Sequence, residues 1–137
     1  MIVLDTSVIL ALFDARDSGH HAAKEWFEER QPRFSTTPLV LAEADHLVLH
    51  RGGQSARAAL LANVASGAFQ ALWWDEAGTE SVSVAEAYPD VGLTDASLVA
   101  LAGRLGTTQI ATFDERHFRA MTPLQGGGHF TLLPMDE

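Results

Sequence analysis

The chain has 137 residues, of which 47% are hydrophobic and 20% charged, and it contains no cysteine. This composition is typical of a globular protein, so we expect one domain over residues 1–137. The lack of cysteine excludes disulfides and thiolate metal ligands, and a bound metal must therefore use oxygen or imidazole. The net charge of −9 argues against a protein that holds nucleic acid mainly by neutralising many phosphates, and it indicates a basic partner.

Two further features limit where the chain acts and what it binds. No apolar run approaches the roughly 20 residues that span a bilayer, and the apolar start lacks a basic leader. We therefore expect a cytoplasmic protein that does not associate with membranes. Of the nine cationic residues, eight are arginine and only Lys24 is lysine. Because arginine suits bidentate phosphate contacts, weak and local nucleic-acid binding stays open.

The first residues predict a buried strand that leads directly into a helix. Residues 2–4 are an apolar, β-branched run, and residues 8–13 continue with apolar side chains at helical spacing. Thr6 or Ser7 is the expected N-cap of this helix. Asp5 then falls at the carboxyl end of the strand, where open α/β sheets place their ligands. The alternative is that Asp5 is only an acid favoured by the dipole at the helix start.

The remaining segments alternate between helical and extended patterns. Apolar periodicity and capping residues predict helices over residues 20–29, 38–50, 55–65, 77–87, 94–105 and 117–121. Short apolar runs predict strands over residues 33–36, 69–74, 108–113 and 130–133, with the run over 69–74 as a candidate edge strand. A hydroxyl of Thr36-Thr37 is the expected cap of the helix over 38–50, with Pro38 in its first turn. Gly52-Gly53 ends this helix, and the short connection makes the next helix antiparallel to it. The alternation predicts an α/β fold, with a mostly parallel sheet covered on both faces.

Glu43 is an acid inside an apolar stretch of the helix over residues 38–50. Burying it would be costly unless another group paired with it, whereas Asp45 points about 200° away around the same helix. The alternative is an exposed helix face, which is the usual position of a helical glutamate.

Two more acids lie at the ends of apolar elements in the second half of the chain. Asp95 lies in the first turn of the helix over 94–105, where the helix dipole stabilises a carboxylate, with Thr94 as the expected cap. Asp114 follows the strand over 108–113 and so repeats the position of Asp5. These two strand-end acids are neighbours if their strands pair. Asp90 is a further candidate acid, although Pro89-Asp90 is also an ordinary turn signal.

Four carboxylates that converge need a cation. Two unit charges about 5 Å apart at an effective dielectric near 20 repel by about 3 kcal/mol. Ligation by oxygen alone indicates Mg²⁺ or Mn²⁺. Such an ion activates water and holds phosphate oxygens during in-line attack, so the residues indicate phosphodiester hydrolysis.

The arrangement of these residues resembles the PIN domain, and within that family the VapC toxins of bacterial toxin–antitoxin pairs. The resemblance rests on Leu4-Asp5-Thr6-Ser7, Glu43, Leu93-Thr94-Asp95-Ala96, Thr112-Phe113-Asp114 and His117-Phe118. It implies a 5′-nuclease-like α/β/α sandwich that cleaves RNA with Mg²⁺ or Mn²⁺, is inhibited by a cognate antitoxin and forms a homodimer. The matching catalytic and metal-binding positions are Asp5, Glu43, Asp95 and Asp114. Ser7 and Thr112 match as nearby hydroxyls, and Asp90 as a less regular fifth acid.

Two other functions compete with ribonuclease activity. A phosphatase of the haloacid dehalogenase type also starts from an Asp after a strand, but it needs a second Asp two residues later, where this chain has Ser7, and a lysine near the later acids, whereas Lys24 is the only one. A PIN-like module that binds RNA or protein without cleaving it is the other alternative. The complete set of four acids counts against it, and a cleavage assay with and without chelator separates the two.

Overall fold

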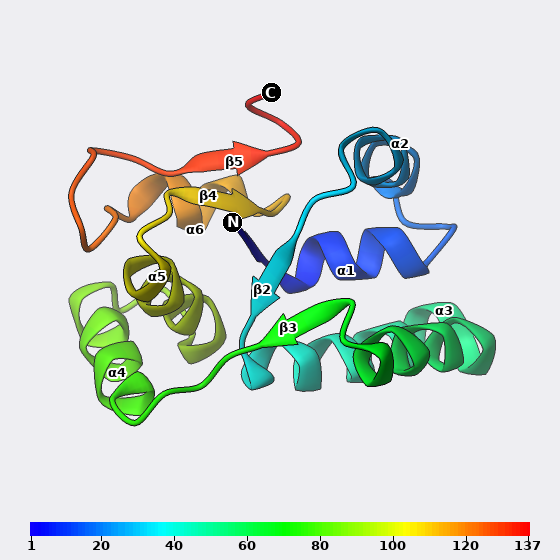
Figure 1. The fold of residues 1–137 in the computed structure, drawn as a ribbon, viewed down its shortest axis with the longest axis horizontal. Helices are drawn as coiled ribbons and strands as arrows, with labels where there is room; N and C mark the ends of the chain where they lie inside the picture. Colours follow the sequence, from blue (N-terminus) through cyan, green and yellow to red (C-terminus); the bar gives the residue numbers. More distant parts are fainter.

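The computed structural model describes all 137 residues and contains one five-stranded parallel sheet with strand order β3-β2-β1-β4-β5 (Figure 1). The strands are β1 (Ile2–Leu4), β2 (Phe34–Thr36), β3 (Phe69–Ala71), β4 (Gln109–Ala111) and β5 (Thr131–Leu133). The apolar run at the start of the chain therefore forms the central strand, as its burial on both faces requires. The edge position expected for the segment after residue 69 is confirmed.

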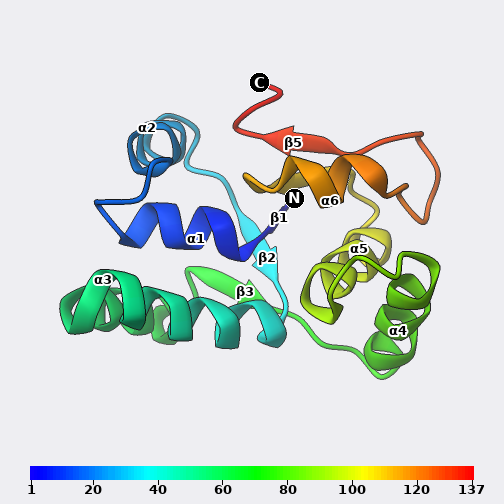
Figure 2. The same cartoon turned by 180° about the vertical axis from the view of Figure 1, so that it is seen from behind.

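Six helices cover the two faces of this sheet. They are α1 (Thr6–Phe13), α2 (His20–Arg30), α3 (Pro38–Ser66), α4 (Ala77–Ala87), α5 (Leu93–Leu105) and α6 (Glu115–Ala120). Figures 1 and 2 show α1, α2 and α3 on one face and α4, α5 and α6 on the other. The predicted α/β/α sandwich is confirmed. No helix combines the length and the apolar character that crossing a bilayer would require.

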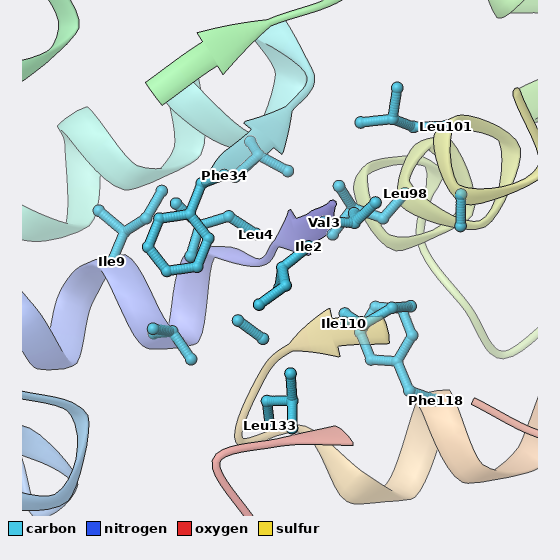
Figure 3. Close-up of a cluster of buried hydrophobic side chains, with 14 of the residues drawn as sticks. Ile2, Val3, Leu4, Ile9, Phe34, Leu98, Leu101, Ile110, Phe118 and Leu133 are labelled. Carbon is cyan, nitrogen blue, oxygen red and sulfur yellow. The ribbon is translucent and has the colours of Figure 1, made fainter. Parts of the chain in front are cut away.

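The core lies around β1. Figure 3 shows Ile2, Val3 and Leu4 surrounded by apolar side chains from both helical layers, such as Ile9 of α1 and Leu98 of α5. Val3 and Leu4 are completely buried. Fully burying a side chain of this size stabilises a fold by about 1.5 to 3 kcal/mol, so the central strand is firmly placed and fixes the position of the residue that follows it.

Helix α3 folds back on itself at Gly53. This glycine has φ 83°, a left-handed conformation that interrupts the helix. The Arg57 Nε then lies 2.7 Å from the Asp45 Oδ1, although a straight helix would separate residues 12 apart by about 18 Å. The two expected antiparallel helices are thus the two halves of α3, joined at the predicted glycines.

Two expected helix caps are wrong, and one is right. Helix α1 has Asp5 at its N-cap position in place of Thr6 or Ser7, because the Ser7 hydroxyl donates to the Asp5 carboxylate instead of capping. Helix α5 begins at Leu93 with Gly92 as N-cap, so Thr94 lies inside the helix. In α3 the cap is as expected, since the Thr37 hydroxyl accepts a hydrogen bond from the Val40 backbone N–H.

Candidate active site

Four acids gather at the carboxyl edge of the sheet. Asp5 directly follows β1, Asp114 lies just beyond β4, Glu43 belongs to the first half of α3, and Asp95 is in the first turn of α5. All four line one cavity of about 330 Å³. The pairing of β1 with β4 brings the two strand-end acids together, as the sequence predicted.

Asp5 is the most buried of these acids and is held by two hydroxyls. Its Oδ2 accepts hydrogen bonds from the Ser7 Oγ at 2.8 Å and from the Thr112 Oγ1 at 2.6 Å. Burial raises the pKa of Asp5, and the bonds from Thr112 and Ser7 oppose that increase because they favour the ionised form. The two predicted supporting hydroxyls are therefore direct partners of Asp5.

The same two hydroxyls also hold the segment that carries Asp114. The Phe113 backbone N–H donates to the Ser7 Oγ at 2.9 Å, and the Asp114 backbone N–H donates to the Thr112 Oγ1 at 2.9 Å. The ends of β1 and β4 are thus connected by a continuous set of hydrogen bonds, which fixes Asp114 relative to Asp5.

This arrangement disfavours the ionised form of Asp95. Burial, together with the negative charges of Asp5 and Asp114, raises its pKa to about 7, with a smaller contribution from Glu43 and an opposing one from His117. Near neutral pH, a large fraction of Asp95 is therefore protonated in the absence of a cation.

His117 is a member of the site to which the sequence assigned no role. Its Nδ1 lies 2.9 Å from the Asp114 Oδ2 and 3.3 Å from the Asp95 Oδ2. Asp114 also caps α6, because its Oδ1 accepts from the His117 backbone N–H at 3.1 Å. The sequence signal for His117 was its position three residues after Asp114, because this spacing places both side chains at the same end of a helix.

Three other acids, Glu43, Asp45 and Asp90, differ in their positions relative to the cavity. Glu43 is an exposed residue, as its alternative interpretation held, but it lines the cavity and its charge acts on Asp95. Asp45 points away from the cavity toward Arg57, as the helical period predicted. Asp90 is exposed in the turn before α5 and is not among the residues that line the cavity.

Comparison with known proteins identifies the family. Residues 2–122 match the PIN domain. The chain belongs to the PIN-domain family. It is 38% identical over 136 residues to Ribonuclease VapC26 of Mycobacterium tuberculosis, covering 97% of this chain and all of that protein. It is 32% identical over 115 residues to Ribonuclease VapC29 of the same species, covering 82% of this chain and 85% of the relative.

A solved structure supports the same assignment of the fold. The crystal structure of VapC20 from Mycobacterium tuberculosis, a toxin that cleaves the sarcin-ricin loop, superposes with a TM-score of 0.77 at 24% sequence identity. The match covers 85% of this chain and 92% of that one. The parallel sheet and its helices are therefore those of a PIN domain of the VapC type.

Two hydrogen bonds of buried hydroxyls, neither of which involves the acids, fix the frame of this PIN domain. The Thr37 Oγ1 at the start of α3 lies 2.9 Å from the Ser97 Oγ of α5. The Thr36 hydroxyl donates to the Leu4 carbonyl at 2.8 Å and so joins the ends of β2 and β1. The helices that carry Glu43 and Asp95 are therefore connected directly across the carboxyl edge of the sheet.

The side chains of this PIN domain fit a divalent cation. Ligand atoms of Asp95, Asp114 and His117 all lie within 4.8 Å of one another. No arginine or lysine forms an ion pair with Asp5, Asp95 or Asp114, so their repulsion is unrelieved except by His117. A cation would remove the charge repulsion that raises the pKa of Asp95.

Proposed function

We propose that this protein is a metal-dependent endoribonuclease and the toxin of a type II toxin–antitoxin pair. The observation that carries the proposal is the group of acids that line one cavity at the carboxyl edge of the sheet, where burial and then the charges of Asp5 and Asp114 raise the pKa of Asp95 to about 7. Relatives that match over most of the chain are named ribonucleases, which supports hydrolysis of RNA over other phosphodiesters. The proposed active domain spans residues 1–137.

The proposed ion is Mg²⁺ or Mn²⁺, held by Asp95 and Asp114 with Asp5 and Glu43 completing the acidic lining. The carboxylates favour these hard cations, and the nearby imidazole of His117 is more compatible with Mn²⁺ than with Mg²⁺. When bound, such an ion activates water and neutralises charge on the phosphate oxygens.

The protein's own residues orient the site for this chemistry. Ser7 and Thr112 hold one oxygen of Asp5 in place, and Thr112 also fixes the backbone of Asp114. His117 holds the Asp114 carboxylate from the other side. Because Asp5 and Asp114 are positioned before substrate binds, these two acids need little reorganisation during the reaction.

The rival phosphatase function is disfavoured by specific residues. The Ser7 hydroxyl is engaged with Asp5 and the Phe113 backbone, and no lysine lines the cavity. A non-cleaving module would have no need for an acid whose pKa is shifted this far.

We also propose a cognate antitoxin whose basic segment reaches the acids, with an arginine that displaces the metal. The net charge of −9 and the acidic cavity favour such a partner. A homodimer stays a prediction from the resemblance to the toxins, and a cytoplasmic location stays a prediction from the sequence. Full cleavage activity in Mn²⁺ with the partner still bound would show that inhibition does not work in this way.

The decisive test is RNA cleavage by the purified protein in Mn²⁺ and in chelator, with mapping of the RNA ends. Asp95→Asn should lower the rate about a thousandfold, since metal catalysis supplies several kcal/mol of the barrier. Asp45→Asn is the matched control. It also removes one acid, but Asp45 faces Arg57 and not the cavity. Cleavage that persists in chelator and in Asp95→Asn would contradict the proposal, and RNA binding without cleavage would favour the non-cleaving module.

A further inference from the structure

A second cavity adjoins the one that holds the acids. It has a volume of about 470 Å³ and shares Ser7, Leu10 and Arg51 with the acidic cavity. Its other lining residues are Asp17, Ser18, Gly19, Ala22 and Phe113. Arg51 is the only arginine or lysine that lines either cavity, so the boundary between them carries the single positive charge of this region.

The backbone of Arg51 is held against α1. Its carbonyl accepts a hydrogen bond from the guanidinium of Arg16. The next residue, Gly52, lies so close that a Cβ there would come 3.7 Å from the Phe13 carbonyl oxygen and 2.8 Å from the Ala56 Cβ. The base of the Arg51 side chain is thus fixed at the boundary between the two cavities.

The guanidinium of Arg51, in contrast, has no partner within the protein. Arg16, Arg30, Arg57 and Arg119 each form an ion pair with a carboxylate, whereas Arg51 is exposed and forms none. In a chain with net charge −9, an unpaired arginine that borders an acidic cavity but does not neutralise it is free to bind an external anion.

We propose that Arg51 binds the RNA phosphate next to the scissile one, and that the second cavity holds the intervening nucleotide. This inference rests on the proposed ribonuclease function and adds a substrate subsite to it. The guanidinium fork matches a phosphate in two hydrogen bonds. The second cavity is in the size range of small-ligand pockets, and Phe113 gives it an apolar wall for a base.

The first test uses Arg51→Ala with a short RNA whose cleavage position has been mapped. KM should rise about tenfold with kcat within about threefold, as expected for a lost charged contact that acts in binding. The slope of log affinity against log salt should fall by about 0.7, the value for one phosphate of a single strand. Arg51→Lys should restore part of the affinity, because it keeps the charge but loses the fork.

Arg33→Ala is the matched control, because Arg33 is also exposed and free of ion pairs but precedes β2 at the opposite edge of the sheet. It should leave both constants unchanged. If Arg51→Ala lowers kcat with KM unchanged, the residue acts on the acids and the proposal is wrong. Unchanged RNA binding with lost affinity for a partner protein would overturn it as well.

The second test locates the phosphate. Replacing one linkage beside the cleaved bond with an uncharged methylphosphonate should weaken the wild-type protein about tenfold and Arg51→Ala hardly at all, since the contact is already absent. Equal losses in both proteins would overturn the assignment. Binding of an unmodified single-stranded RNA to wild type and to Arg51→Ala, followed by fluorescence anisotropy, requires neither cleavage nor a mapped position. It therefore tests Arg51 even if the wild-type protein proves inactive and the proposed function fails.

Discussion

The acids of this protein fall into two groups with opposite electrostatics. Asp45 and Asp136 lie on the outside, where hydrogen bonds from Arg57 and Arg119 hold the pKa of each carboxyl below its usual range. Asp5 and Asp95 lie at the carboxyl edge of the sheet, where burial raises the pKa of each. The same residue type is thus stabilised as an anion in one region and destabilised as an anion in the other.

This difference separates the acids that contribute to holding the fold from those that are candidates for chemistry. The charge of an acid that is paired with arginine is already balanced, so the acid does not need a cation from solution. Acids that face one another without a cationic side chain weaken the fold unless a cation binds, so they indicate a functional site more specifically than their number does. The chain has 18 acids and only nine lysines and arginines, and the arginines that form ion pairs, which are Arg16, Arg30, Arg57 and Arg119, do so outside the cavity.

The largest effect should come from removing one charge from the unpaired group. We expect Asp95→Asn to stabilise the metal-free protein by about 1 to 3 kcal/mol at pH 8, discounted for water in the open cavity. Wild-type protein should gain about 2.7 kcal/mol in Mn²⁺ at 100 times its Kd, and the variant clearly less. Urea denaturation in chelator and in Mn²⁺ measures both, and equal metal responses would mean that Asp95 is not part of the metal site.

Asp95 is a better choice for this measurement than Asp5. In Asp5→Asn the new amide would face the Ser7 and Thr112 hydroxyls, both of which donate to the carboxylate, so a lost hydrogen bond would mask the relieved repulsion.

A somewhat smaller effect is expected from pH. Asp95 has a pKa of about 7 in the fold and its usual value of 3.8 when unfolded, so the folded protein binds the extra proton between these values. The stability of the metal-free protein should therefore fall by about 1 to 2 kcal/mol as pH rises from about 4 to about 7. Asp45 and Asp136 have lowered pKa values, so their stabilisation is lost only as pH falls below about 4. A flat profile between pH 4 and 7 in wild type, or an unchanged slope in Asp95→Asn, would contradict this prediction.

The smallest effect should come from the paired group. Arg57→Ala breaks the exposed contact with Asp45 between the two halves of α3. We expect a slightly lower melting temperature that converges with wild type in 1 M salt, because salt screens exposed ion pairs. A loss that persists at high salt would show that the contact orders the turn of α3 by packing instead of by charge.

Much of the fold was predictable because the apolar pattern is strong. Residues 2–4 form the central strand, and the glycines after residue 51 reverse α3 as expected. The ends of elements were less predictable. The strand expected over 108–113 ends at Ala111, since Thr112 and Phe113 use their polar groups to contact Asp5 and Ser7. Helix α6 begins at Glu115 because Asp114 caps it, a contact that no local pattern requires.

The candidate site was predictable to the extent that it consists of strand-end and helix-start acids. Asp5, Glu43, Asp95 and Asp114 line one cavity, as expected from their positions in the α/β pattern. Arg51 had no signal in the sequence, and the only signal for His117 was its spacing of three residues after Asp114. The importance of His117 depends on two carboxylates brought together by the sheet, and that of Arg51 depends on its having no ion pair, which only the three-dimensional arrangement reveals.

The strand order also determines when the acids can meet during synthesis. The first strand made is the central one, and its neighbour β4 is among the last, so the hydrogen bond between Asp5 and Thr112 joins residues 107 positions apart. Until β4 has left the ribosome, Asp5 has neither Thr112 nor Asp114 beside it. A nascent chain therefore has no complete group of acids at the carboxyl edge of the sheet until synthesis is nearly finished.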